Sequence, residues 1–206
     1  MDTREERAES CRLYRDCRMS IESTLGRLLR SVRAGDRRLV WNDPRLDAPA
    51  TLRLSSPAFG DGGRMPPRSA GAGVGDNVSP ALEWTGVPAG AEELAIIVQD
   101  PDAPLPRPVT HLIAYGVDPN SRGAPEGAFD AGQTGSIRLG RGSFGRVGYQ
   151  GPRPVAGHGP HRYVFQMLAL AKPLHFGSPP HLAMVTAAMA GIVLARGMLT
   201  GSYERS

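Results

Sequence analysis

The stretch LAIIVQDPDAPLPRPVTHLIAYGV, residues 94–117, decides the fold. It holds two near-continuous apolar runs, 94–99 and 111–117, joined by a loop that is rich in proline. Proline fixes the backbone angle φ and restricts the residue before it, so the loop is expected to turn and to stay extended rather than form a helix. Apolar runs without polar alternation are typical of strands that are covered on both faces. The stretch therefore predicts two buried strands.

The rest of the chain after residue 50 has the same β texture. A third apolar run, 162–170, predicts another covered strand, and 51–54 and 82–84 predict shorter ones. Residues 180–195 are expected to form a helix, followed by a closing strand at about 197–203. With 26 glycines and 19 prolines in 206 residues, the composition favours turn-rich β structure over a helical bundle. The fold class predicted from the sequence is mainly β.

Residues 1–48 differ from the rest of the chain, because they are rich in arginine and glutamate and hold no proline before Pro44. Their apolar residues recur at helical spacing: Ile21, Leu25, Leu28, Leu29 and Val32. We expect an amphipathic helix that packs on the main domain or on a second subunit, which would make a homodimer. The sharper alternative is peripheral contact with a membrane surface through residues 19–38. The chain is accordingly divided into an N-terminal helical extension, 1–48, and a domain, 49–206.

Charge and cysteine content limit the partners and the compartment. Five arginines and one aspartate between residues 27 and 38 carry a net charge equal to the +4 of the whole chain. This basic cluster lacks interleaved aromatic residues, so no nucleic-acid partner is expected. Cys11 and Cys17 would project to different faces of a helix, which argues against a disulfide. The acidic N-terminus is unlike a signal peptide, and the longest apolar run is too short for a membrane span. We expect a cytoplasmic protein.

Two polar clusters stand where proline-containing loops feed into predicted strands. One combines Asp100 and His111. The other combines His161 and Tyr163, which share one face of a strand while Arg162 lies on the opposite face. Two such clusters at the same edge of a sheet would form a small, rigid, polar pocket. Two histidines and a carboxylate could also form a metal triad, and neither cluster contains a serine or cysteine nucleophile.

Several further motifs make the sequence recognisable. They are SPAFGDGG (56–63), NVSPALEWTGVP (77–88), DPDAP followed by His111, FGRVGYQGPRP (144–154), GPHRYVF (159–165) and LARGMLTGSYER (194–205). In this order they resemble the phosphatidylethanolamine-binding protein family, in its bacterial Raf-kinase-inhibitor-like branch. The resemblance runs from about residue 50 to 205. It implies a large antiparallel sheet packed on a smaller sheet, with a C-terminal helix. Residues 1–48 lie outside it.

The resemblance also implies a site and a function. The DPDAP and GPHRY loops would meet in an anion pocket lined by Asp100, Ala103, Pro104, His111, Gly151, Pro152, His161 and Tyr163. The implied function is non-catalytic binding of a phospholipid head group or phosphorylated ligand, such as phosphate or phosphorylethanolamine, with no metal or cofactor. Imidazole and phenol groups would donate hydrogen bonds to the anion. Regulation of a partner protein through the same pocket is a related expectation.

Individual residues carry more specific expectations. Asp100 would orient His111 or His161 and raise its pKa, so that an imidazolium is available to the anion, and Asp102 would pair with Arg162 behind the pocket. The branch usually has two tryptophans where Val109 and Thr110 stand, and a small residue where Arg153 stands, so the pocket mouth should be less aromatic and more cationic. The remaining histidines are expected at the surface or at helix caps: His158, His175 and His181.

Two other classes of function stay open on the sequence alone. One is a hydrolase that uses His111 or His161 as a base. The other is an interaction protein whose pocket is vestigial and whose N-terminal helix binds the partner.

Overall fold

The computed structural model describes residues 22–133 and 135–205. Cys11, Cys17 and Ile21 lie outside this range, so the expectations on them stay untested. The strands are β1 (Arg53–Ser55), β2 (Leu82–Thr85), β3 (Glu93–Asp100), β4 (Val109–Val117), β5 (Gly123–Ala124), β6 (Arg138–Leu139), β7 (His161–Leu170) and β8 (Val193–Tyr203). The helices are α2 (Leu182–Met189) and four short 3-10 helices, η1 (Asp36–Arg38), η2 (Val40–Asn42), η3 (Pro44–Leu46) and η4 (Pro67–Ser69). Residues 22–28 are also helical.

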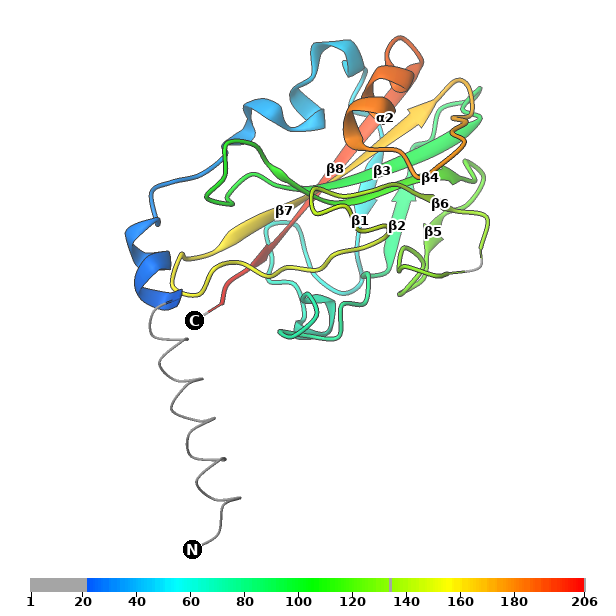
Figure 1. Cartoon of the computed structure of the whole chain (residues 1–206). Helices are drawn as coiled ribbons and strands as arrows, with labels where there is room; N and C mark the ends of the chain where they lie inside the picture. The colour runs from blue at the N-terminus through cyan, green and yellow to red at the C-terminus, as the bar shows by residue number, and fades with distance from the viewer. Residues whose placement is uncertain (1–21, 134, 206) are drawn as a thin grey trace, which may run out of the picture.

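The strands form two antiparallel sheets (Figure 1). The larger has the order β6-β4-β3-β7-β8 and the smaller the order β1-β2-β5. Residues 94–117, with their two apolar runs, supply most of β3 and all of β4, which are neighbours inside the larger sheet. This architecture confirms the predicted fold class, a large antiparallel sheet packed on a smaller one.

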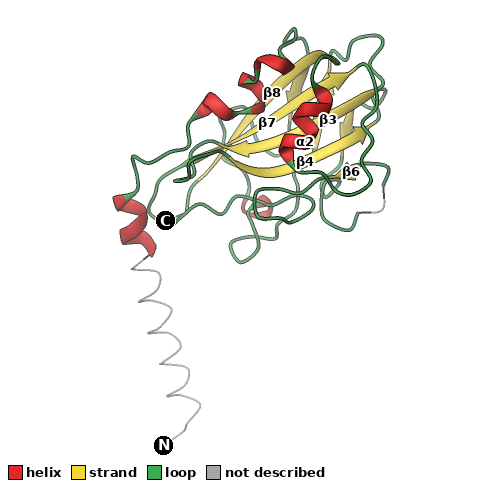
Figure 2. Ribbon diagram, turned by 45° about the horizontal axis from the view of Figure 1, so that its top comes forward, coloured by secondary structure: helices red, strands yellow, loops and turns green. Residues whose placement is uncertain are grey.

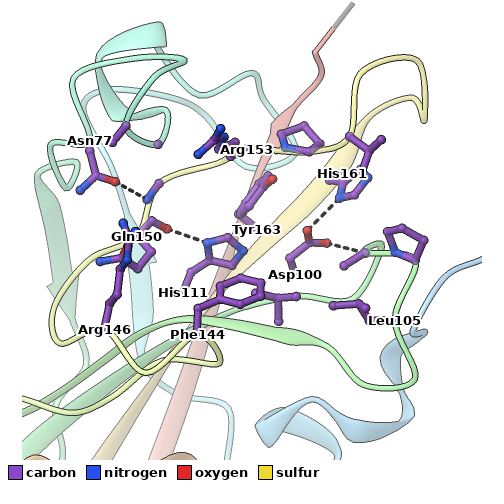
Figure 3. A pocket seen from close by; sticks show the side chains of 18 residues that line it. Asn77, Asp100, Leu105, His111, Phe144, Arg146, Gln150, Arg153, His161 and Tyr163 are labelled. Carbon is purple, nitrogen blue, oxygen red and sulfur yellow. Dashed lines mark hydrogen bonds and ion pairs between the residues drawn. The ribbon is translucent and has the colours of Figure 1, made fainter. Parts of the chain in front are cut away.

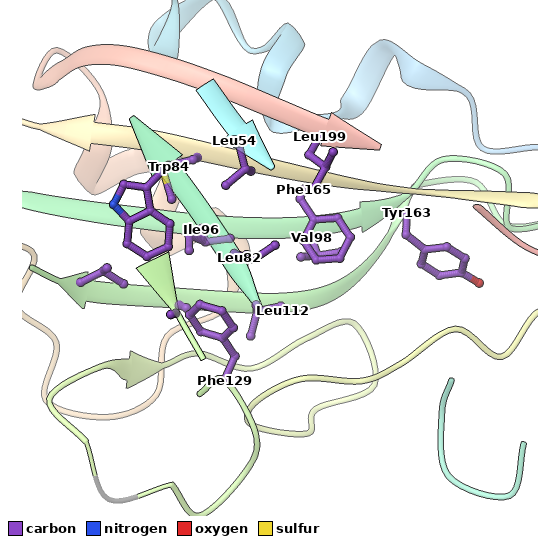
Figure 4. Packing of buried hydrophobic residues seen from close by; sticks show 14 of the residues in the cluster. Leu54, Leu82, Trp84, Ile96, Val98, Leu112, Phe129, Tyr163, Phe165 and Leu199 are labelled. Carbon is purple, nitrogen blue, oxygen red and sulfur yellow. The ribbon is translucent and has the colours of Figure 1, made fainter. Parts of the chain in front are cut away.

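The main core lies between the two sheets. From the smaller sheet, Leu82 and Trp84 point toward Ile96, Val98 and Phe165 of the larger sheet (Figure 4). The Trp84 indole N–H donates a hydrogen bond of 2.8 Å to the carbonyl oxygen of residue 121. Trp84 is therefore a core residue, as expected from the sequence.

Helix α2 lies over the opposite face of the larger sheet (Figure 2), where a second core forms. There Ile97, Ile113 and Leu168 pack with Val185 and Met189 of α2. Every residue of β3 is buried, because the strand has an apolar layer on each side. This explains the unbroken apolar runs in the sequence.

The predicted N-terminal extension takes part in this second core. Val40 in η2 and Leu46 in η3 are buried there, at 4% and 1% exposure. The backbone N–H of Val40 also donates to the Gln99 side-chain oxygen over 2.8 Å. The division at residue 48 remains a prediction, but residues 40–46 pack against the larger sheet.

The C-terminal helix is shorter than the sequence indicated. A helix was expected over 180–195, whereas α2 ends at Met189 and β8 begins at Val193. The break falls at Gly191, whose φ of +77° suits a turn. The residues after it pair with β7 along nearly its whole length. Sheet pairing has therefore overridden an apolar pattern that also suits a helix. The two-residue strands β5 and β6 were not predicted either.

Candidate functional site

A cavity of about 450 Å³ opens at the end of the larger sheet where β3 ends and β7 begins (Figure 3). We call it the histidine pocket. Its walls come from the loop after β3, the start of β4, the 144–155 loop and the start of β7. The residues that line it are Gly71, Ala72, Asn77, Asp100, Ala103, Pro104, Leu105, Val109, His111, Phe144, Arg146, Gln150, Gly151, Arg153, Pro154, Val155, His161 and Tyr163.

Seven of the eight residues that the resemblance implied lie in this lining; the exception is Pro152. The Pro152 carbonyl instead accepts a hydrogen bond of 2.8 Å from the backbone N–H of Gly71. The contact ties the 151–154 loop to the 69–71 segment. Gly151 makes an even closer approach, because a Cβ there would lie 2.1 Å from the Ser69 carbonyl oxygen. Pro152 therefore supports the wall from behind.

Asp100 ends β3 on the face that also carries Val98, two residues earlier. Its side chain is 5% exposed. One carboxylate oxygen accepts backbone hydrogen bonds from Asp102 and Ala103, over 2.7 and 3.1 Å. The other lies 2.8 Å from Nδ1 of His161. Asp100 therefore orients His161, one of the two histidines proposed from the sequence, and shapes the DPDAP turn.

A β-bulge places His111 in the pocket. In the register of β3 and β4, Val98 pairs with Leu112 but Gln99 pairs with Thr110, which leaves His111 as the extra residue. Simple alternation along β4 would point His111 to the face opposite Leu112. The bulge turns its side chain into the histidine pocket instead. The ring packs edge-on against Tyr163, with 5.1 Å between ring centroids.

The hydrogen bonding of His111 fixes its tautomer. Nδ1 lies 2.6 Å from the carbonyl oxygen of Gln150, which only accepts, so Nδ1 carries the hydrogen. Burial lowers the pKa of His111 below 6.5, against the opposing charge of Asp100. At neutral pH, therefore, the other ring nitrogen, Nε2, is a hydrogen-bond acceptor. This differs from the expectation that His111 donates to an anion.

His158 corrects the sequence prediction of a surface or capping residue, because it is completely buried. Its Nδ1 lies 2.8 Å from Nε2 of His161, and its Nε2 lies 2.8 Å from the Leu29 carbonyl oxygen and 3.2 Å from that of Val32. The N-terminal segment supplies these carbonyls and buries the ring, which no local sequence pattern shows. His175 and His181 are exposed, as predicted.

Asp100, His161 and His158 form a continuous chain of hydrogen bonds that ends at the Leu29 carbonyl. Both ring nitrogens of His161 are engaged, and neither is free to donate to a ligand as expected from the sequence.

Segment 22–38 packs directly behind the pocket loops. The backbone N–H groups of Ala34 and Gly35 donate to the carbonyls of Ala103 and Pro101 over 3.0 and 2.8 Å. A Cβ on Gly26 would lie 2.0 Å from the Ala156 carbonyl oxygen. These contacts show that the segment is in van der Waals contact with both loops that form the pocket.

The predicted pair of Asp102 and Arg162 is present on the outer face of β7. Arg162 donates to both carboxylate oxygens, over 2.8 and 2.9 Å, and also to Asp36. Burial alone would raise the pKa of Asp102, but the hydrogen bonds and charge of Arg162, with the charge of Arg33, outweigh it and lower the pKa. The pair clamps the DPDAP loop onto β7 and onto the N-terminal segment.

The rim of the pocket is cationic and apolar. Arg146 and Arg153 line the mouth and form no ion pair with any described carboxylate. Phe144 and Leu105 also line the pocket, with 67% and 44% of their surface exposed. The sequence predicted the charge of Arg153 at the mouth but no role for the other three. This rim is suited to a ligand with a negative charge and an apolar part.

Asn77 is a further pocket residue that was not predicted. It adopts a left-handed conformation, φ +58°, that asparagine tolerates better than most residues. From there its side-chain oxygen accepts a hydrogen bond of 2.9 Å from the Gly151 N–H. The only sequence signal was its place at the head of the NVSPALEW motif.

Comparison with known proteins decides the family. A model of the phosphatidylethanolamine-binding protein family matches residues 55–204. The chain belongs to the phosphatidylethanolamine-binding protein family. A UPF0098 protein of Methanothermobacter thermautotrophicus is 40% identical over 156 residues, which cover 75% of this chain and 99% of that protein.

Two solved members of the family share the fold. YbcL of Escherichia coli, described as a member of the mammalian phosphatidylethanolamine-binding protein family, superposes with a TM-score of 0.71 at 27% identity, over 76% of this chain and 100% of YbcL. A homologue from Chlamydia trachomatis gives 0.68 at 29% identity, over 76% of this chain and 99% of the homologue. The matched family residues hold both pocket loops, whereas segment 22–38 precedes them.

Proposed function

We propose that the histidine pocket binds one small anionic group, the phosphate of a phospholipid head group or of another phosphorylated ligand, without transforming it. The observation that carries the proposal is the pair of unpaired arginines, Arg146 and Arg153, at the mouth of a cavity with an apolar rim. Arginine forms strong charge-assisted hydrogen bonds with phosphate oxygens. Phe144 and Leu105 offer apolar surface to the rest of the ligand.

The floor of the pocket selects for a ligand that brings a hydrogen. Nε2 of neutral His111 accepts a hydrogen bond, and Asp100 and His161 satisfy one another. A phosphate monoester in its singly charged form donates its own P–O–H to Nε2 while its other oxygens face the arginines. The phosphodiester of a phospholipid has no P–O–H, so an ammonium group of the head group would supply the hydrogen instead. At lower pH, a protonated His111 would donate a hydrogen bond from Nε2 to an oxygen of the same anion.

Titration with phosphate and phosphorylethanolamine, followed by NMR, tests this proposal. Shifts should gather in residues 100–111 and 144–163. Arg153→Gln should weaken binding by about tenfold, the scale of one charge-assisted hydrogen bond. Arg37→Gln is the matched control, because Arg37 is an exposed arginine that does not line the pocket. Equal effects of the two substitutions would contradict the proposed site.

A hydrolase is the second candidate, and the neutral His111 in the pocket lining favours it because such a group can act as a base. The lining contains no serine, threonine or cysteine, so the nucleophile would be water. Incubation with a phosphate monoester, followed by phosphorus NMR, separates the two candidates. We expect no release of phosphate; release that His111→Gln abolishes would establish the hydrolase instead.

Localisation and regulatory partners stay predictions. Within residues 22–133 and 135–205, no helix is long and apolar enough to cross a bilayer. The same residues contain no group of three histidine, cysteine, aspartate or glutamate side chains placed to hold a metal ion.

A further inference from the structure

A second cavity, of about 340 Å³, lies on the opposite face of the same strand ends. We call it the arginine cavity. Asp100 and His111 point into the histidine pocket, whereas their chain neighbours Gln99 and Thr110 line the arginine cavity. The sheet and the loop after β3 separate the two. The remaining walls come from residues 38, 107–108, 141–143 and the first turn of α2.

Three arginines line this cavity: Arg38, Arg107 and Arg141. Arg38 donates to the Pro106 carbonyl and Arg141 to that of Gly145. None of the three forms an ion pair with a described carboxylate, and the lining holds no aspartate or glutamate. Like charges gathered without a counter-ion repel one another, and an anion among them would remove that repulsion.

The buried side chains of the cavity are donors with free hydrogens. The Gln99 side-chain oxygen already accepts from the Val40 N–H and from Gln166, over 2.8 and 3.0 Å, which fixes its amide orientation. The Gln99 amide nitrogen has no described hydrogen-bond partner, although the residue is only 1% exposed. The hydroxyl of Thr110, a residue 5% exposed, has no described partner either.

The remaining wall adds donors and positive potential. The Ser143 hydroxyl oxygen accepts from the Thr110 N–H over 2.8 Å, which leaves its own hydrogen available. Leu182 and Ala183, at the positive end of the eight-residue helix α2, also line the cavity. The cavity therefore combines buried donors with exposed or half-buried cationic ones, the arrangement that binds an oxyanion with several charged oxygens.

We propose that the arginine cavity is a second binding site, specific for a doubly charged phosphate group, either free or as a monoester. Two or more arginines contact its outer oxygens, and the Gln99 amide and the Thr110 hydroxyl contact the inner ones. The site is independent of the proposed function, because it shares no residue with the histidine pocket.

The test uses inorganic phosphate and glycerol 3-phosphate with the full chain, followed by NMR. Shifts are expected in Ser143, Ala183 and the Gln99 side-chain amide, in addition to any in the histidine pocket. Arg107→Gln should weaken binding at these signals by about five- to tenfold. Tighter binding of the monoester would identify a phosphorylated small molecule as the source, and equal binding the phosphate group alone.

Two variants separate a built site from general basic charge. Thr110→Val keeps every charge and nearly the same shape, and should still weaken binding by about threefold. Arg37→Gln removes an arginine next to Arg38 that does not line the cavity, and should have little effect. The proposal is overturned if phosphate leaves Ser143, Ala183 and Gln99 unshifted, or if Arg37→Gln weakens binding as much as Arg107→Gln. If Arg153→Gln abolishes the shifts in the histidine pocket and leaves those at Ser143, Ala183 and Gln99, the arginine cavity is supported as a separate site.

Discussion

The two cavities at the end of the larger sheet use the same strands in opposite ways. On one face, Asp100 is satisfied by His161, which in turn contacts the buried His158. On the other face, Gln99 and Thr110 offer donors to a space that three arginines surround. In the two proposals, the histidine pocket therefore recognises its ligand through hydrogen-bond polarity and rim charge, whereas the arginine cavity recognises its ligand through charge and donors throughout. Alternation along a strand is enough to build two chemistries from adjacent residues.

The largest expected effect comes from Gly151→Ala, which would damage the histidine pocket alone. The new Cβ would lie 2.1 Å from the Ser69 carbonyl oxygen and 2.7 Å from the Gly71 nitrogen. Because both contacts are backbone, we expect a loss of about 3 kcal/mol in the free energy of unfolding. Denaturant titration measures it, and Gly177→Ala, which meets nothing within 4 Å, is the control. Phosphate shifts at Ser143 should survive in the folded variant; their loss would show that the cavities are not independent.

Substitution of His158 should have the next largest effect. His158→Leu leaves the buried Nε2 of His161 without a partner, which costs about 2 kcal/mol. It also removes the donor to the Leu29 carbonyl, so the amides of Ala34 and Gly35 should exchange hydrogen faster. His158→Gln offers one acceptor and one donor and should restore both properties. Unchanged amide exchange in the leucine variant would show that the N-terminal segment does not depend on His158.

Anion binding in the histidine pocket should depend on pH. Burial lowers the pKa of His111, so its Nε2 becomes a donor only below the usual histidine value of about 6.5. Sulfate, which does not titrate here, should therefore bind the histidine pocket up to about tenfold more tightly as the pH falls from 7 to 5. His111→Gln should abolish this dependence. Arginines keep their charge throughout, so Arg107→Gln should leave the dependence unchanged.

The same lowered pKa sets the sign of one contribution to stability. Above pH 6.5 His111 is neutral in both the folded and the unfolded chain. Below it the unfolded chain binds the proton more readily, so stability is lost as the pH falls toward the lowered value. In thermal unfolding between pH 7 and pH 5, wild type should lose more stability than His111→Gln; equal losses would show that His111 is not the group responsible.

The smallest effect on stability is expected from the exposed apolar stripe, which we define as Leu25 and Leu28 of the N-terminal helix. Neither residue lines a cavity. Leu25 and Leu28 are 51% and 75% exposed, so changing Leu28 to serine should alter the free energy of unfolding by less than about 0.5 kcal/mol. If a second copy of the chain covers the stripe, wild type should be a dimer by light scattering and Leu28→Ser a monomer. An unchanged mass, with loss of binding to anionic vesicles, would favour membrane contact through the neighbouring arginines.

The sequence alone determined the features that depend on local pattern. Unbroken apolar runs predicted β3, β4 and β7, because a strand between two cores needs no polar face. Alternation placed His161 and Tyr163 together and set Arg162 apart to pair with Asp102. The family motifs indicated both pocket loops, and all of the residues expected to line the pocket except Pro152 do so.

Only the tertiary structure decided the features that depend on register and on distant segments. A one-residue bulge turned His111 into the pocket, and no pattern in residues 109–117 marks it. His158 is buried because residues 29 and 32 lie over it, more than a hundred residues away in the chain. The arginine cavity likewise joins residues 38, 107, 141 and 181, whose separate neighbourhoods look like ordinary surface. Local sequence sets which face a side chain takes, but the packing of distant segments decides what it meets there.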